Sequence, residues 1–271
     1  MNTNTTVLMD SINRKAWSDR DSVKHFESLD GWTDPGEQIA TALIAPEVAD
    51  QPILDLGVGA GRTVPLFRKI SRDYTALDYT LELVEACRRR HPRVTVLHGD
   101  ARDLSRFPDS SFKLVAFSFN GIDAVNPEDR LKILHEVYRV LRPGGIFFFS
   151  AHNIEGPGHR EKLNFGIYWS KNPFKVMVRS ARALLHVRRT LNNYRNLSAL
   201  SVQADGYSLR NASAHDHGIV IHYISLEKQQ RQLESVGFQP GALAYSNLGG
   251  PPVFEGDDTR QMWWFHFLAR K

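Results

Sequence analysis

The sequence predicts an α/β fold: a doubly wound, mostly parallel sheet of seven strands with an antiparallel last strand, plus a helical lid insertion. Three observations predict it. An apolar run at 53–56 leads directly into alternate glycines at positions 57, 59 and 61. Short apolar runs then alternate with helical segments up to residue 150, which is the pattern of right-handed βαβ units. Two more apolar runs close the chain.

The expected strands are apolar runs bounded by polar or turn residues. They lie at 53–56, 74–79, 93–97, 112–117, 146–150, 238–245 and 262–269. Helices are expected at 81–90, at 127–141, where the apolar residues lie on one side, and from Leu226 onward. Arg142-Pro143-Gly144-Gly145 ends the second of these helices. The last two strands are expected to form an antiparallel pair at one sheet edge.

The composition is that of one large globular domain with an insertion. The 271 residues are 42% apolar, which is enough to bury a full core. Cys87 is the single cysteine, which excludes a disulfide framework, and no metal site is expected. No apolar run approaches the ~20 residues that cross a bilayer, and residues 1–10 show no signal-peptide pattern. We therefore expect a cytoplasmic protein.

The glycine spacing indicates which nucleotide-like ligand is bound. Alternate glycines let the backbone approach a ligand closely, and Asp78, which closes the second apolar run, can accept both hydroxyls of a ribose. A dinucleotide site needs G-x-G-x-x-G, but the last position of that pattern is Arg62. Residues 55–61 read D-x-G-x-G-x-G instead. In this motif and in the strands that follow, the chain resembles the class I S-adenosylmethionine-dependent methyltransferases.

The resemblance covers residues 30–152 and resumes at 223–271. It implies a Rossmann-like core that binds S-adenosylmethionine and releases S-adenosylhomocysteine. The aromatic residues Trp17, Phe26 and Trp32 are expected to shield the methyl group from water. The implied division of the chain is an N-terminal helical flap at 1–44, the cofactor-binding core at 45–153, a lid and substrate insertion at 154–222, and the end of the core sheet at 223–271.

The resemblance also implies a role for each part of the cofactor site. The ribose hydroxyls are expected on Asp78, the adenine ring against Tyr79, and the adenine amino group at Asp100-Ala101. The methionine portion is expected over the glycine loop and beside the backbone of Ser118-Phe119, with Arg62 or Thr63 near its carboxylate. The expected cofactor-binding residues are Asp55, Gly57, Gly59, Gly61, Arg62, Thr63, Asp78, Tyr79, Asp100, Ala101, Ser118 and Phe119.

Candidate catalytic residues follow the fourth and fifth strands. Asn120, Asp123 and His152 lie at the carboxyl edge, where open α/β sheets bind ligands. A hydroxyl acceptor must pass its proton to a base, and histidine is suited to take it near neutral pH. His152 is the first candidate for the base, with His217 and His222 as the alternatives. A structural role remains open for each histidine.

The insertion contains a basic helix at about 173–190. Its basic residues recur at steps of three and four and so share one face; they are Lys175, Arg179, Arg182, His186 and Arg189. The neighbouring stripe of Phe174, Val178, Ala181 and Leu185 is expected to pack against the protein. The basic face is compatible with a solvated surface, with an anionic or carrier-linked acceptor, or with peripheral contact to an anionic membrane that holds a lipid-linked substrate.

The predicted function is methyl transfer to a small molecule, with a hydroxyl of a sugar, quinone-like compound or natural product as the acceptor. No nucleic-acid partner is expected, because Ser118-Phe119-Asn120-Gly121 lacks the Asn/Asp-Pro-Pro-aromatic motif that grips a flipped base. Three alternatives stay open: transfer to an amino group, a cofactor-binding protein without catalysis, and a nicotinamide dehydrogenase, which Arg62 disfavours. The sequence assigns no oligomeric state.

Overall fold

The computed structural model describes residues 3–165 and 170–271, with the backbone alone at 3–7 and 182. The helices are α1 Thr3–Ser18, α2 Arg20–Glu27, α3 Pro35–Val48, α4 Val64–Ile70, α5 Leu81–Arg90, α6 Pro127–Val140, α7 Pro173–Ser198, α8 Ala214–His217 and α9 Leu226–Val236, with short 3-10 turns η1 Gly121–Ala124 and η2 Gly158–Arg160. The strands are β1 Ile53–Leu56, β2 Tyr74–Asp78, β3 Thr95–His98, β4 Phe112–Phe117, β5 Leu141–Asn153, β6 Val202–Ala204, β7 Tyr207–Ala212, β8 Ile219–Ile224, β9 Leu243–Ser246 and β10 Trp264–Arg270.

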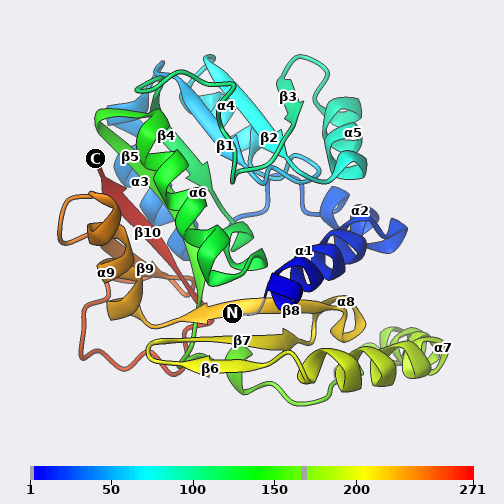
Figure 1. Ribbon diagram of the computed structural model, residues 1–271. Coiled ribbons are helices and arrows are strands. Elements are labelled where there is room, and N and C mark those ends of the chain that lie inside the picture. The colour runs from blue at the N-terminus through cyan, green and yellow to red at the C-terminus, as the bar shows by residue number, and fades with distance from the viewer. Residues whose placement is uncertain (1–2, 166–169) are drawn as a thin grey trace.

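Seven strands form the predicted core sheet. The parallel strands lie in the order β3-β2-β1-β4-β5, and β10 pairs antiparallel with β5 and carries β9 on its outer side (Figure 1). The doubly wound sheet with an antiparallel last strand is therefore confirmed. The strand order reverses between β1 and β4, and this is the point at which open α/β sheets bind ligands.

Helices cover both faces of this sheet, with α6 in front of it and α3 behind it in Figure 1. Residues of α3, α4 and α5 form one core cluster with Phe148 of β5, and residues of α6 and α9 form the other with Phe147 and Phe149. The alternation follows from the two-residue repeat of a strand, because neighbouring side chains point to opposite faces. Burial of β5 on both faces explains why Ile146-Phe147-Phe148-Phe149 is an unbroken apolar run.

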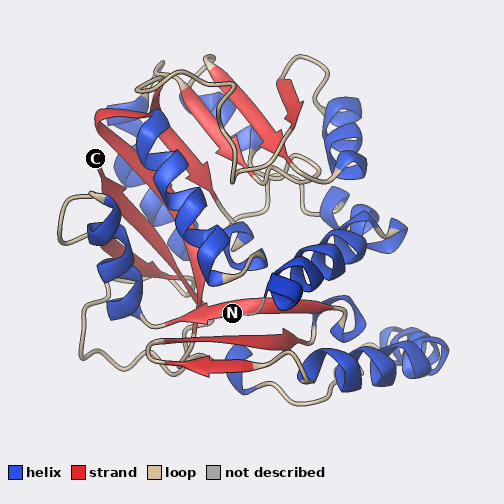
Figure 2. Cartoon of the chain, in the orientation of Figure 1, coloured by secondary structure: helices blue, strands red, loops and turns tan. Residues whose placement is uncertain are grey.

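The insertion is only partly helical, so the prediction of a helical lid is incomplete. It contains α7, but β7 and β8 form an antiparallel pair with β6 outside it, and β8 joins the end of β5 through His152 and Asn153 (Figure 2). The run Ile219-Val220-Ile221 is rich in β-branched residues, which favour a strand. The ten-stranded sheet therefore extends beyond the seven-stranded core.

The orientation of α7 differs from the prediction. Phe174 and Leu185, expected to pack inward, are 65% and 83% exposed. The buried residues of α7 are instead Ala183, Thr190 and Leu197, which recur every seven residues. This side of the helix packs on β7 and α8, whereas Phe174, Met177, Leu184 and Leu185 face outward. In the part of the chain that the structure describes, no helix is long and apolar enough to cross a membrane.

Candidate active site

A cavity of about 310 Å³ opens at the carboxyl ends of β1, β2, β4 and β5. The helices α1 and α2 close one side of it with Trp17, His25 and Phe26, while β7 and β8 supply an apolar wall. All the expected cofactor-binding residues line the cavity except Gly61. Of the expected catalytic residues, His152 and Asn120 line it, whereas His217 and His222 do not.

The glycine loop after β1 requires glycine for two different reasons. Gly57 has a φ of +61°, and a Cβ there would lie 2.5 Å from the ring of Phe117. Gly61 has a φ of +99° and packs against His91, whose ring would be 2.5 Å from an added Cβ. Gly57 therefore shapes the cavity, whereas Gly61 allows the loop to pack against α5.

The two carboxylates of the motif have different partners. Asp78 accepts hydrogen bonds from the backbone amides of Gly59 and Thr80, both at 2.8 Å, and so ties the glycine loop to the end of β2. Asp55 accepts from Thr63 Oγ1 at 2.5 Å and from Tyr74 Oη at 2.6 Å. Burial raises the pKa of both carboxyl groups, that of Asp55 to about 6. Asp55 thus connects the end of the glycine loop at Thr63 to Tyr74 of β2.

Arg62 is held by a buried acid that the sequence analysis did not identify. Its guanidinium forms a two-pronged ion pair with Glu37 of α3, at 2.7 and 2.9 Å, and also donates to Ser118 Oγ at 2.7 Å. Glu37 is 1% exposed. The signal was present in Asp34-Pro35-Gly36-Glu37, because Asp34 caps α3 and so fixes Glu37 in its first turn. Arg62 reaches the cavity already paired with this carboxylate.

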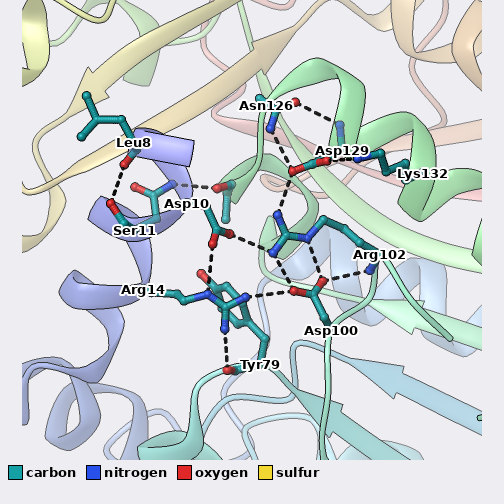
Figure 3. Close-up of polar contacts among 12 residues, drawn as sticks. Leu8, Asp10, Ser11, Arg14, Tyr79, Asp100, Arg102, Asn126, Asp129 and Lys132 are labelled. Atoms are coloured by element: carbon teal, nitrogen blue, oxygen red, sulfur yellow. Dashed lines mark hydrogen bonds and ion pairs between the residues drawn. The ribbon is translucent and has the colours of Figure 1, made fainter. Parts of the chain in front are cut away.

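Helix α1 is bound directly to the expected adenine side of the cavity. The Arg14 guanidinium lies 4.1 Å from the centre of the Tyr79 ring and donates to Asp100 Oδ2 at 2.9 Å (Figure 3). Arg102 also donates to Asp100, with its Nη2 at 2.6 Å, and pairs with Asp129 at 2.7 Å. Although burial opposes it, these arginines hold the pKa of Asp100 below its usual value. Asp100 is therefore already shared between two cations.

His152 lies on the cavity wall with one ring nitrogen fixed. Its Nδ1 lies 2.8 Å from Asp123 Oδ2, and its Nε2 lies 3.4 Å from Asn120 Nδ2. An amide nitrogen can only donate, and an ionised carboxylate can only accept. Both contacts therefore assign the proton to Nδ1 and the lone pair to Nε2. The lone pair accepts only the long 3.4 Å contact from Asn120, and an acceptor hydroxyl that replaces this contact would meet the arrangement a general base requires.

Asp123 is in turn held by Arg130, and both side chains are fully buried. Arg130 forms an ion pair with Asp123 and a hydrogen bond with Gln229 of α9. Burial alone would raise the pKa of Asp123, but Arg130 and His152 hold it below its usual value. The carboxylate therefore stays ionised next to His152. Arg130 had no recognisable signal in the sequence.

The turn after β4 presents Asn120 to the cavity. Phe119 and Asn120 have φ values of +57° and +61°, which are uncommon for residues with side chains. The backbone N–H of Asn120 donates to Ser150 Oγ at 2.7 Å, and the side-chain oxygen Asn120 Oδ1 is buried without a partner among the described residues. A buried acceptor that lacks a donor is costly. This oxygen is therefore available to a bound ligand.

Two of the three candidate bases have structural environments instead. His217 uses both ring nitrogens, one with Asn211 Oδ1 at 2.8 Å and the other accepting from the Asn164 amide at 3.0 Å. His222 is fully buried on β8, and neither of its ring nitrogens has a partner among the described residues. We therefore withdraw both as bases.

His215 is the histidine that the sequence analysis left out of the site. It lines the cavity with a left-handed backbone, φ +54°, and its Nδ1 lies 2.7 Å from Ser22 Oγ. Its ring stacks near those of Trp17 and Phe26. Burial lowers the pKa of His215 to about 4, so the ring is neutral at neutral pH.

His222→Phe is expected to stabilise the protein, and more so in acid. Burial, with Arg130 nearby, lowers the pKa of His222 to about 3. Below about pH 6.5 the unfolded chain takes up a proton that the folded protein does not. The native protein therefore loses stability as pH falls from about 6.5 toward about 3. At about pH 5 this protonation costs the native protein about 2 kcal/mol, and the variant avoids it.

The measurement is urea unfolding of both proteins at about pH 5 and pH 7.5. At pH 7.5 the variant should exceed the native protein in stability only by the gain from removing two unpaired ring nitrogens. A stability difference that is the same at the two pH values would contradict a neutral, buried His222.

Comparison with known proteins identifies the core. Residues 53–145 match a family model described as a methyltransferase domain. A probable S-adenosylmethionine-dependent methyltransferase of Mycolicibacterium smegmatis is 34% identical over 123 residues, which are 45% of this chain and 46% of the relative. A demethylmenaquinone methyltransferase of Clavibacter sepedonicus is 37% identical over 111 residues, 40% of this chain and 44% of the relative. The chain thus spans less than half the length of these curated relatives.

The likeness in fold extends over most of the chain. An S-adenosylmethionine dependent methyltransferase from Mesorhizobium loti superposes with a TM-score of 0.56 over 87% of this chain and 98% of that one, at 18% identity. The resemblance read from the glycine motif agrees with these findings: residues 53–145 match a methyltransferase domain, and the fold around them is that of S-adenosylmethionine-dependent methyltransferases.

Proposed function

We propose that this chain transfers the methyl group of S-adenosylmethionine to a hydroxyl oxygen of a small, largely apolar acceptor. The observation that carries the proposal is the His152–Asp123 pair, which faces the same cavity as the glycine loop. An amino acceptor would need no such base. The name of the Clavibacter relative, a demethylmenaquinone methyltransferase, supports a quinone-like acceptor.

The cavity lining fits the cofactor. The cavity surface at Gly57 and Gly59 is bare backbone, so the methionine portion can approach it closely. We place the ribose hydroxyls at Asp78 and the adenine ring between Tyr79 and Asp100-Ala101. Arg62 and Thr63 lie at the start of α4, where a carboxylate is favoured by the helix dipole.

Each residue of the proposed mechanism has a separate task. When bound, the cofactor supplies a methyl group on a positively charged sulfur that a nucleophile can displace in line. Holding the two reactants in attack geometry can contribute ~7–11 kcal/mol. His152 Nε2 takes the proton of the acceptor hydroxyl, and Asp123 stabilises the resulting imidazolium through Nδ1.

The flap formed by α1 and α2 excludes water from this step. Trp17 and Phe26 line the cavity, whereas Trp32 lies outside its lining and is 42% exposed. The flap is anchored by Asn13, which is fully buried, donates to the carbonyls of Ala124 and Val220, and accepts from the Val220 amide. We infer that this anchor keeps the aromatic residues over the cofactor.

The acceptor side of the cavity is mostly apolar. Ala212, Ile219, Ile221 and Trp264 form much of its wall. Among the described residues, α7 contributes none to the lining. The cations of α7 whose side chains are described therefore lie outside the acceptor pocket, and we no longer assign them to recognition of an anionic acceptor.

The proposal is tested by binding and by turnover. S-adenosylhomocysteine is expected to bind in calorimetry, whereas NADH is not. Release of S-adenosylhomocysteine from S-adenosylmethionine is then measured with a phenol, a hydroquinone, a sugar, a carboxylic acid and an amine. Turnover with a hydroxyl compound supports the proposal. Turnover with the amine alone would favour amino-group transfer, and binding without any turnover would favour a non-catalytic role.

Asp78→Ala is expected to weaken S-adenosylhomocysteine binding by about 10- to 100-fold, because hydrogen bonds to a charged group are worth about 1.5–3 kcal/mol each. The variant also loses the contact that ties Gly59 to β2. Calorimetry measures the change. Asp73→Ala, which removes an exposed acid at the other end of β2, is the matched control and should bind as the native protein does. Equal affinities for both variants would place the ribose elsewhere.

A further inference from the structure

We propose that α7 docks on the surface of an anionic lipid bilayer, with its outward apolar stripe in the headgroup region. The stripe consists of Phe174, Met177, Val178, Ala181, Leu184 and Leu185, which follow one another at steps of one or three residues. Among the large apolar residues that the structure describes, Leu185 at 83% and Leu184 at 76% are the most exposed. Contiguous apolar patches of this kind mark interaction surfaces.

The positive charge around the stripe indicates that its partner is anionic. Residues 162–204 contain eight lysines and arginines and no aspartate or glutamate. Lys175 and Arg188 are exposed, and none of the ion pairs between described residues involves either of them. A helix with an apolar face bordered by cations, and too polar to span, is the type that lies in the plane of an anionic membrane.

A second copy of this chain is a poorer partner for the same face. Two α7 helices packed through the stripe would bring acid-free, cationic segments together, and like charges at a contact oppose association. Two cations of α7, His186 and Arg189, pair with Asp216 and Asp19 of the same chain. These pairs attach α7 to the rest of the protein and leave the stripe outward.

The position of α7 links docking to the acceptor side of the cavity. Its inner side packs on β7 and α8, and these elements supply Ala212, Ala214 and His215 to the cavity lining. In Figure 1, α7 lies at the margin of the molecule and one end extends past the neighbouring strands. Docking through α7 therefore brings this wall of the cavity near the lipid.

The test is co-sedimentation of the full chain with vesicles, without cofactor or acceptor, so that its outcome is independent of methyl transfer. Binding is expected to vesicles that contain phosphatidylglycerol, to be weaker on phosphatidylcholine alone, and to fall with added salt. Leu184→Glu/Leu185→Glu is expected to lower the partition coefficient at least about tenfold, because it places charge in the apolar face. Lys175→Glu/Arg188→Glu should remove the preference for anionic lipid.

Leu248→Glu/Phe254→Glu is the matched control, since it also replaces two exposed apolar residues by acids, 59% and 60% exposed, away from α7. This control should bind vesicles as the native chain does, and all variants should bind S-adenosylhomocysteine unchanged. Light scattering measures the oligomeric state and so tests whether the stripe joins two copies of the chain instead. A dimer that Leu184→Glu/Leu185→Glu converts to a monomer, with no binding to anionic vesicles, would overturn the proposal, as would equal loss of binding in the control.

Discussion

Replacing His152 by Gln is expected to lower kcat by about 10²- to 10⁴-fold, which is the range for loss of a general base. The binding constant for S-adenosylhomocysteine should stay within about twofold, because His152 acts on the acceptor and not on the adenosyl group. The ratio of kcat between the two proteins is measured with the best hydroxyl acceptor.

Asp123→Asn provides the companion measurement. An amide at this position can donate to His152 Nδ1, which favours the wrong tautomer, so kcat should fall by about 10²-fold or more. His135→Gln, which changes an exposed histidine on α6, is the control and should keep full activity.

If His152→Gln retained native activity, the acceptor would need no base, and amino-group transfer would be the better assignment.

Replacing Arg130 by Met is expected to have the largest effect on stability. Asp123 and Arg130 are both fully buried, so the variant leaves a buried carboxylate without its cation. Loss of one partner of a buried ion pair costs about 3–5 kcal/mol. The free energy of unfolding, measured in urea, should fall by this amount at neutral pH.

The pH dependence of this loss follows from the same charge. Without Arg130, His152 still opposes the effect of burial, so the pKa of Asp123 should rise relative to that in the native protein. As pH falls, protonation of Asp123 then relieves the unpaired buried charge in the variant. The deficit relative to the native protein should therefore be smaller at about pH 5 than at about pH 8.

A second substitution separates the structural role from the positioning role. Arg130→Met/Asp123→Leu removes the buried charge altogether and should recover part of the lost stability. It should not recover activity, because His152 Nδ1 still lacks its acceptor. If the double variant were as active as the native protein, Asp123 would have no part in orienting His152.

Much of the cofactor site was predictable because its signals are local. The glycines at 57 and 59 and the acid at 78 sit at the ends of adjacent parallel strands, and this sheet order fixes their proximity. The same logic placed Asn120 and His152 at one edge. By contrast, Glu37 meets Arg62 across 25 positions of sequence, and Gln229 meets Arg130 across 99. No local sequence pattern indicates such long-range contacts.

By itself, the sequence determined the doubly wound core, the glycine loop and the edge of the sheet at which the cavity lies, because strand periodicity and turn residues act over a few positions. The tertiary structure alone decided which of the three candidate bases lines the cavity. It also decided which side of α7 is covered. Periodicity states which residues share a face, but only packing against β7 and α8 determines the face that water, or lipid, meets.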